Sequence, residues 1–316
     1  MDISKIFIDS FVKSTARAAY GASLYKGKND KIAADKAAVD EMRKELNLIN
    51  MKGKIVIGEG ELDEAPMLYV NEKVGTQNGE EFDIAVDPLE GTNFTAQNLP
   101  NALSVMAIAR KGNILNAPDT YMDKIAVGPG LPDDLINLDF NIKKNIQLLS
   151  DAKNTSPNKL SACVLDRPRH QSIISDLKSL GVKINYITDG DVSGIISVAQ
   201  VNSLNDIYIG TGGGPEGVLA AAALSCLGGQ MQTRLIYQNE SEREKTKNMG
   251  ILDLNKKYNI LDMVSGDVIF CASGVTDGDI VKGIKDLGDS FESETYVLHK
   301  SSKINKLIKN IIKKWI

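Results

Sequence analysis

Residues 82–92 read FDIAVDPLEGT, an apolar segment that ends in two carboxylates. Apolar residues alternate with other residues over 82–87, which predicts a β-strand. A proline fixes the turn after Asp87, and Glu90 follows three residues later. This spacing is expected to bring two carboxylates and a backbone carbonyl near one point, an oxygen-only set that Mg²⁺ or Mn²⁺ prefers. An acidic turn is the alternative that this segment leaves open.

The segments on either side add a strand and more acid. Residues 55–57 predict a strand that ends in Gly-Glu-Gly-Glu, so Glu59 and Glu61 follow its carboxyl end. Ligand sites of α/β sheets lie at such ends, although a solvated acidic loop would look the same. Residues 102–109 form a further apolar run, which predicts another strand.

Residues 32–49 predict an amphipathic helix, because apolar residues recur at steps of three and four. Asp35 lies one turn before Val39 on the same face. A carboxylate on a buried face needs a partner or a metal ion. The alternative is an acid of the first turn that the helix dipole favours.

Past residue 155 the pattern becomes alternating strand and helix, which is typical of the α/β class. Strands are predicted at 160–165, 182–187 and 206–210, and helices at 169–180, after Asp191 and at 217–227. We divide the chain into halves 1–155 and 156–316, or treat it as one structural unit if the boundary does not hold.

The second half holds two segments suited to phosphate. Residues 211–216 read TGGGPE before the helix at 217–227, and backbone N–H groups of such a turn can hold phosphate. The spacing is not the dinucleotide fingerprint, and Glu216 is either a first-turn acid or a metal ligand. Residues 166–170 read DRPRH, where two arginines can bind phosphate or form ordinary surface charge.

Composition narrows the class of protein. The net charge of -4 gives no electrostatic case for a nucleic-acid partner. Three separated cysteines without a C-x-x-C pair support neither a zinc ribbon nor a disulfide framework. With two histidines, a metal must be held mainly by oxygen. No signal peptide and no apolar run of spanning length is evident, so we expect a cytoplasmic protein without a membrane partner.

The tail, residues 301–316, carries five lysines among isoleucines. We predict a terminal helix that packs its apolar stripe on the body of the protein. A basic amphipathic helix lying on a membrane is the alternative.

Several motifs together resemble one family. The segment DPLEGT is similar to the signature of the lithium-sensitive, metal-dependent phosphatases. Combined with other motifs in order, it closely resembles class II fructose-1,6-bisphosphatase of the GlpX type, from about residue 3 to about residue 300. These motifs are IVIGEGELDEAPMLYVNEKVG at 55–75, AVDPLEGT at 85–92, NAPDTYMDK at 116–124, VGPG at 127–130, RPRH at 167–170, DGD at 189–191 and GGPEG at 213–217.

The resemblance implies a layered α/β/α/β/α sugar-phosphatase fold, Mn²⁺ or Mg²⁺ as cofactor, and a homodimer or homotetramer. It implies hydrolysis of the 1-phosphate of fructose-1,6-bisphosphate in gluconeogenesis. The first half would bind metal and the second half would bind substrate.

Site residues follow from the matching motifs. The implied metal ligands are Asp35, Glu59, Asp87, Glu90 and Glu216. The implied catalytic residues are Thr92, which would orient the attacking water, Asp35 as its acceptor partner, and Glu59. The implied substrate contacts are Lys31, Glu90, Gly91, Thr92, Tyr121, Arg167, Pro168, Arg169, Asp189, Gly190, Asp191 and Gly213.

Two departures and four rival functions stay open. The family often has Lys-Pro-Arg-His where residues 167–170 read RPRH, and D-K-N-T-A-D where residues 30–35 read DKIAAD. Sedoheptulose-1,7-bisphosphate is a second candidate substrate, alone or alongside the first. An inositol- or nucleotide-phosphatase is disfavoured, because its W-D-x-[AG] signature is missing and Trp315 is the only tryptophan. An NAD-dependent oxidoreductase and a non-catalytic sugar-phosphate sensor are rivals from other classes.

Overall fold

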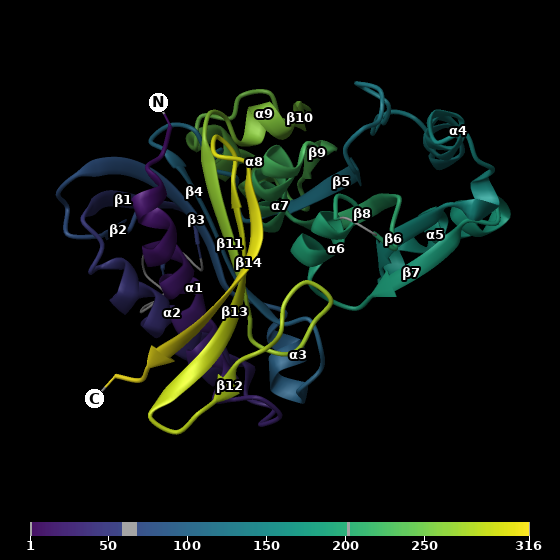
Figure 1. Cartoon of the computed structure of the whole chain (residues 1–316). Coiled ribbons are helices and arrows are strands. Elements are labelled where there is room, and N and C mark those ends of the chain that lie inside the picture. The colour runs from purple at the N-terminus through teal and green to yellow at the C-terminus, as the bar shows by residue number, and fades with distance from the viewer. Residues whose placement is uncertain (1, 59–67, 201–202, 316) are drawn as a thin grey trace. The chain divides into compact units, whose positions relative to one another are not determined.

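The computed structural model describes residues 2–58, 68–200 and 203–315, and the chain forms two compact units (Figure 1). Unit 1 comprises Met1–Leu115 and Ser265–Ile316, and unit 2 comprises Asn116–Val264. The boundary expected near residue 155 lies inside unit 2, between α4 (Ile142–Ala152) and η2 (Pro157–Lys159). Local composition marks a surface turn there, but it carries no sign that the chain returns to the first sheet after residue 264.

Unit 1 is built on an eight-stranded sheet. Its strands are β1 (Met51–Ile57), β2 (Lys73–Val74), β3 (Glu80–Glu90), β4 (Leu103–Arg110), β11 (Val268–Gly274), β12 (Lys285–Asp286), β13 (Ser290–His299) and β14 (Ile304–Lys313). The order is β12-β13-β11-β4-β3-β1-β2, with β14 paired to β13. The pair β1–β3 is parallel, whereas β3–β4, β4–β11 and β11–β13 are antiparallel. Chain segments from both ends of the sequence therefore share one sheet.

Two helices, α1 (Ile8–Ser23) and α2 (Lys31–Leu46), lie side by side on this unit (Figure 1). Val39, Met42 and Leu46 are buried, which confirms the predicted apolar stripe of the second helix. Close packing of the two helices requires Gly21, because an added Cβ would lie 2.5 Å from the Ala37 carbonyl oxygen. Short helices η1 (Lys5–Phe7) and α3 (Thr92–Gln97) complete the unit.

The C-terminal tail is a strand, and the predicted terminal helix is wrong. All ten residues of β14 pair antiparallel with β13, from Ile304 opposite His299 to Lys313 opposite Ser290. Ile312 is buried and joins the core of the unit. Isoleucine favours strands because its branched side chain packs well on a pleated surface. Pairing with β13 determines that the tail forms a strand and not a helix, and the sequence of the tail alone does not reveal this partner.

Unit 2 is built on a six-stranded sheet of order β10-β9-β5-β8-β6-β7. Its strands are β5 (Tyr121–Val127), β6 (Ser161–Leu165), β7 (Lys183–Ile187), β8 (Ile207–Gly213), β9 (Gln230–Ile236) and β10 (Lys257–Asn259). Its remaining helices are η3 (Pro168–His170), α5 (Gln171–Ser179), α6 (Asp191–Ser197), α7 (Gly214–Leu227), α8 (Glu240–Asn248) and α9 (Ile260–Met263). The predicted alternation of strand and helix is confirmed, with α7 beginning three residues earlier than expected.

The α/β fold class is confirmed, because each unit combines a mixed sheet with packed helices. In the part of the chain that the structure describes, none of the helices has the length and apolar character needed to cross a membrane.

Candidate functional site

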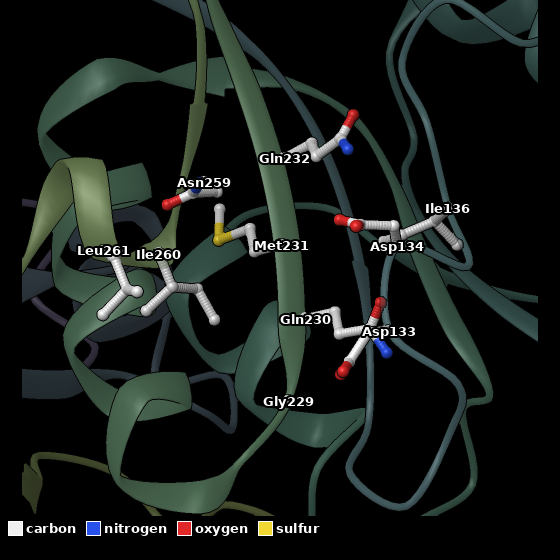
Figure 2. A pocket seen from close by; sticks show the side chains of 10 residues that line it. All are labelled: Asp133, Asp134, Ile136, Gly229, Gln230, Met231, Gln232, Asn259, Ile260 and Leu261. Atoms are coloured by element: carbon white, nitrogen blue, oxygen red, sulfur yellow. The ribbon is translucent and has the colours of Figure 1, made fainter.

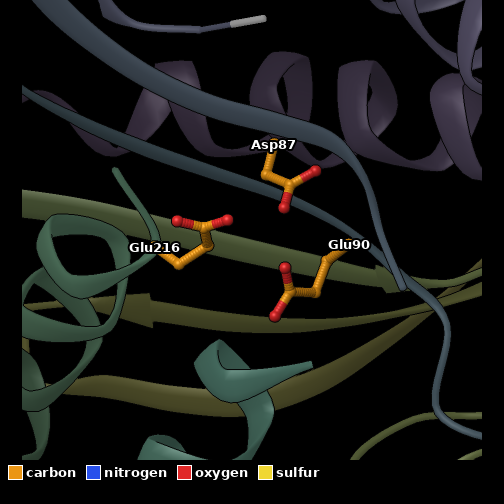
Figure 3. A group of neighbouring side chains, drawn as sticks. All are labelled: Asp87, Glu90 and Glu216. Atoms are coloured by element: carbon orange, nitrogen blue, oxygen red, sulfur yellow. The ribbon is translucent and has the colours of Figure 1, made fainter. Parts of the chain in front are cut away.

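The two carboxylates of the DPLEGT segment lie at an irregularity of β3. Asp87 is paired with Val105 and Glu90 with Leu103, so three steps along β3 match two along β4. Residues three apart in a regular strand face opposite sides. The extra residue of this bulge places both acids on one side of the sheet. Figure 3 shows both side chains at this strand end, and their carboxylate oxygens lie within 4.8 Å of each other.

The turn that follows needs glycine. Gly91 has a φ of 82°, and an added Cβ would lie 2.7 Å from the Phe94 ring. This turn ends β3 and begins α3 at Thr92, whose side chain is half-buried. The predicted trio of Glu90, Gly91 and Thr92 is thus a strand end, a left-handed turn and a helix start in immediate succession.

Helix α2 carries the next two predicted residues. Its N-cap is Asp30, whose carboxylate accepts a hydrogen bond of 2.9 Å from the Ala33 N–H. Lys31 is exposed, and Asp35 is half-buried. Burial raises the pKa of Asp35 to about 6. Such a carboxylate is poorly solvated as an anion, so a nearby cation or a hydrogen-bond donor would stabilise it. Glu59 and Glu61 lie outside the described residues.

In unit 2, three predicted segments follow the carboxyl ends of adjacent strands. β6 pairs in parallel with both β7 and β8. The arginine segment follows β6, the DGD segment follows β7 and the glycine-rich turn closes β8. Carboxyl ends of parallel strands meet at one edge of a sheet, where α/β proteins bind ligands. Tyr121 joins the same edge, because it is paired with Gly213 across β5 and β8.

The arginine segment is anchored to β8 by its own side chains. Arg169 donates from Nε and Nη2 to the Thr211 carbonyl oxygen, at 3.0 and 2.7 Å, and its guanidinium lies 5.0 Å from the centre of the Tyr121 ring. Arg167 donates from Nη1 to the Asp166 carbonyl oxygen at 3.1 Å. The structure therefore brings Arg169 and Tyr121 together and turns Arg167 toward its own loop.

His170 holds this segment from inside the unit. It is fully buried, its Nε2 accepts from the Thr211 N–H at 2.8 Å, and its Nδ1 lies 2.7 Å from the Leu165 carbonyl oxygen. The acceptor role of Nε2 leaves the proton on Nδ1, so the bridge needs the neutral ring. Burial lowers the pKa of His170 and favours that form.

The glycine-rich turn surrounds carboxylates. Gly213 is the N-cap of α7, and an added Cβ there would lie 1.9 Å from Glu216 Oε2. Glu216, drawn in Figure 3, is half-buried, and its Oε2 has no hydrogen-bond partner among the described residues. Burial raises the pKa of this carboxyl, and the charge of Asp191 adds to the rise. The turn thus shields a carboxylate that a cation would stabilise.

The DGD segment begins α6. Gly190 is its N-cap with a φ of 75°, and its N–H donates to Asp189 Oδ1 at 3.2 Å. Asp191 is buried and forms an ion pair with Lys124. The sequence prediction did not single out Lys124, although a lysine inside an apolar strand was a signal that an internal acid exists.

A separate depression of about 350 Å³ lies at the far end of the unit 2 sheet (Figure 2). Its floor includes Gln230 and Gln232, whose side chains accept from the Leu135 and Leu138 N–H groups. Gln230 is paired with Val127, six residues along β5 from Tyr121, or roughly 20 Å at strand spacing. This depression is therefore not part of the predicted substrate site.

Comparisons with known proteins identify the class and then the family. Residues 5–312 match the family model described as bacterial fructose-1,6-bisphosphatase, glpX-encoded. The chain is 41% identical over 314 residues to fructose-1,6-bisphosphatase class 2 of Haemophilus influenzae, covering 95% of this chain and 94% of that protein. It is 41% identical over 315 residues to fructose-1,6-bisphosphatase 1 class 2 of Escherichia coli K12, covering 95% and 93%. The chain belongs to the GlpX family of bacterial fructose-1,6-bisphosphatases, which confirms the resemblance.

Similar solved structures are more distant. The extragenic suppressor protein suhB of Bartonella henselae matches with a TM-score of 0.34 and 12% identity, covering 61% of this chain and 74% of that one. Inositol monophosphatase of Anabaena matches with a TM-score of 0.32 and 13% identity, covering 62% and 71%.

Proposed function

We propose that the protein hydrolyses the 1-phosphate of fructose-1,6-bisphosphate to fructose-6-phosphate and phosphate, as a cytoplasmic step of gluconeogenesis. The observation that carries this proposal is the 41% identity, over 95% of the chain, to proteins named fructose-1,6-bisphosphatase class 2. An enzyme of this name is a phosphate monoester hydrolase. The clustered carboxylates and the arginine segment described above are the residue types that such a reaction uses.

A divalent cation fits the acids that are described. Asp87 and Glu90 present oxygens within 4.8 Å of each other, and Glu216 has a buried oxygen that lacks a partner among the described residues. These are hard oxygen donors, which suit Mn²⁺ or Mg²⁺. We propose Asp35, Glu59, Asp87, Glu90 and Glu216 as the residues that hold the cation. Sequence motifs alone support the assignment of Glu59 and the assignment of Glu216 to the same cation as the acids of unit 1.

The side chains have distinct roles in the proposed mechanism. When bound, the cation neutralises phosphate charge and helps water to ionise. The Thr92 hydroxyl orients the attacking water and passes a proton toward Asp35, with Glu59 as a further catalytic acid. Water oxygen bonds to phosphorus, the phosphorus–oxygen bond to the sugar C1 oxygen breaks, and that oxygen takes up a proton. Direct attack by water leaves no covalent intermediate on the enzyme.

The proposed substrate contacts are those that the sequence motifs imply. Glu90, Gly91 and Thr92 contact the reacting phosphate region, with Lys31 as a further cation and the Gly213 backbone as a donor. The residues of unit 2 bind the sugar hydroxyls and the phosphate that is not cleaved. These are Tyr121, Arg167, Pro168, Arg169, Asp189, Gly190 and Asp191.

A phosphate-release assay over a panel of sugar phosphates tests the function. The panel contains fructose-1,6-bisphosphate, sedoheptulose-1,7-bisphosphate, fructose-6-phosphate and an inositol monophosphate, each with Mn²⁺, with Mg²⁺ and with chelator. We expect fructose-1,6-bisphosphate to be the best substrate and activity to require the metal ion. A clear preference for sedoheptulose-1,7-bisphosphate, or no release from any substrate, would overturn the proposal.

An NAD-dependent oxidoreductase has less support. The glycines of its candidate turn are explained by internal carboxylates, since an added Cβ at Gly212 or Gly213 would meet Asp191 or Glu216. Binding of NAD without metal, measured by titration calorimetry, would reopen that reading. We also propose a homodimer or homotetramer from the resemblance, and sedimentation equilibrium measures the assembly size.

A further inference from the structure

Lys124 is an internal cation of unit 2 that closes the NAPDTYMDK motif but has no role among the implied site residues or in the proposed mechanism. It lies in the middle of β5, and its side chain is 0% exposed. Its Nζ contacts Asp191 Oδ2, and the Asp191 side chain is only 7% exposed. A buried charge is strongly unfavourable unless it is paired, so the fold retains this lysine together with its acid.

Glycines lie around the Lys124–Asp191 pair where a larger residue would collide with these side chains. An added Cβ at Gly212 would lie 2.1 Å from Asp191 Oδ2 and 3.2 Å from Lys124 Nζ. An added Cβ at Gly217 would lie 2.6 Å from Met122 Sδ and 3.1 Å from Lys124 Cε. Gly212, before α7, therefore makes room for the ion pair, and Gly217, inside α7, makes room for the Met122 and Lys124 side chains. The turn that the sequence suggests as a phosphate cradle is packed directly on Lys124.

The pair also connects two proposed substrate-binding segments. Asp191 is the first residue of α6 and follows the left-handed Gly190. Gly212 precedes Gly213, whose backbone is a proposed donor to the substrate. A single buried ammonium group thus fixes the DGD segment against the glycine-rich turn, although it is itself shielded from solvent.

We propose that Lys124 is a positioning residue for substrate binding: by holding Oδ2 of Asp191, it fixes the orientation in which that carboxylate meets a sugar hydroxyl. The proposal rests on the proposed function, because it assigns Asp191 to the sugar. Lys124 acts through Asp191 and does not touch the substrate. Its loss should therefore weaken substrate binding more than it slows the chemical step.

The test is a double-mutant cycle of Lys124→Met and Asp191→Asn, with KM and kcat measured for fructose-1,6-bisphosphate at saturating Mn²⁺. Methionine is close to lysine in length and carries no charge. We expect Lys124→Met to raise KM about 10- to 150-fold, the range for loss of a charge-assisted hydrogen bond, with a smaller change in kcat. The double variant should show the KM of Asp191→Asn alone, because the lysine acts only through the acid.

Controls keep the test decisive if Lys124→Met unfolds. The double variant replaces the ion pair by a neutral pair and avoids an unpaired buried charge, so it supplies the comparison with Asp191→Asn. Lys153→Met is the matched control, since it removes a lysine from the Lys153–Asp206 pair near the surface of the same unit and should leave KM unchanged. Melting temperatures of all variants separate binding from folding.

Each outcome decides the matter. Wild-type protein that releases no phosphate from fructose-1,6-bisphosphate refutes the proposed function before the variants are compared. With active wild-type protein, an unchanged KM in folded Lys124→Met overturns the positioning role. The role is also overturned if the fold-increase in KM of the double variant equals the product of the fold-increases of the two single variants. A double variant whose KM equals that of Asp191→Asn supports it.

Discussion

The acidic strand end of unit 1 and the edge of the unit 2 sheet that is proposed to bind substrate are built in opposite ways. In unit 1, Asp87, Glu90, Gly91 and Thr92 fall within six consecutive positions of the chain, where a bulge in β3 and the left-handed turn at Gly91 set the local geometry. In unit 2, the edge gathers residues from four separate segments, between Tyr121 and Glu216. A local motif keeps its geometry through backbone rules, whereas a dispersed site depends on sheet pairing and on internal anchors. The two regions should therefore respond differently to substitution.

Loss of an acid from the strand end is expected to have the largest effect. Asp87→Asn and Glu90→Gln each remove an anionic ligand, so phosphate release should fall to the background of the assay while the protein remains folded. Chelation should do the same to the wild type, with recovery on adding Mn²⁺. Glu81→Gln is the control, because Glu81 lies on the same strand but pairs with Lys111 at the surface. Near wild-type rates in either variant would remove that acid from the site.

Thr92→Ala is expected to lower kcat by about two to four orders of magnitude, the range for a group that handles a proton or orients water. Thr92→Ser should keep much more activity, because it retains the hydroxyl. Steady-state kinetics at saturating substrate and metal measure both. Equal rates for the alanine and serine variants would show that the hydroxyl is not the working group.

Arg169→Ala tests the dispersed edge, where binding should suffer more than chemistry. Loss of a charge-assisted hydrogen bond of roughly 1.5–3 kcal/mol should raise KM for fructose-1,6-bisphosphate roughly 10- to 150-fold. Slow hydrolysis of a monophosphate that lacks the second phosphate should hardly change. An equal loss on both substrates would assign Arg169 to the reacting phosphate or to the fold.

Trp315→Ala asks whether unit 1 also depends on a distant anchor, the end of the chain. The indole N–H donates to Glu41 Oε2 at 2.7 Å, and the Arg17 guanidinium and the Lys44 ammonium lie over the ring, 4.1 and 3.8 Å from its centroid. Loss of these contacts should lower the free energy of unfolding by about 1–3 kcal/mol. Urea unfolding followed by circular dichroism measures this change, and an unchanged unfolding midpoint would show that Trp315 does not anchor unit 1.

The smallest expected effect is a pH dependence of stability from His170. Burial lowers its pKa below the ordinary value of 6.5, so the unfolded chain binds the proton more readily. Its contribution to stability is complete above pH 6.5 and is lost as the pH falls from there toward the lowered pKa. Urea unfolding at pH 8 and pH 5 should show this, and His170→Gln should show a shallower decline. An equally steep decline in the variant would assign the pH dependence to other groups.

Local patterns were sufficient for much of this protein. The stripe of Val39, Met42 and Leu46 reports which side chains face a core, and their burial follows directly from that period. Alternation over 82–87 predicts the strand, but residues on both of its faces are buried. The family could likewise be identified from sequence motifs, because each motif is a short piece of chain with its own backbone geometry. The strand–helix succession of unit 2 was predicted for the same reason, since its apolar runs alternate with helical periods.

Features that depend on pairing between distant parts of the chain were decided only by the tertiary structure. Residues 304–313 have the composition of an amphipathic helix, yet they form β14 because β13 offers ten residues of backbone donors and acceptors. Lys124 became interpretable only when β5, α6 and α7 were assembled around Asp191. In both cases the energy lies in contacts between residues far apart in sequence, and no local period records such contacts.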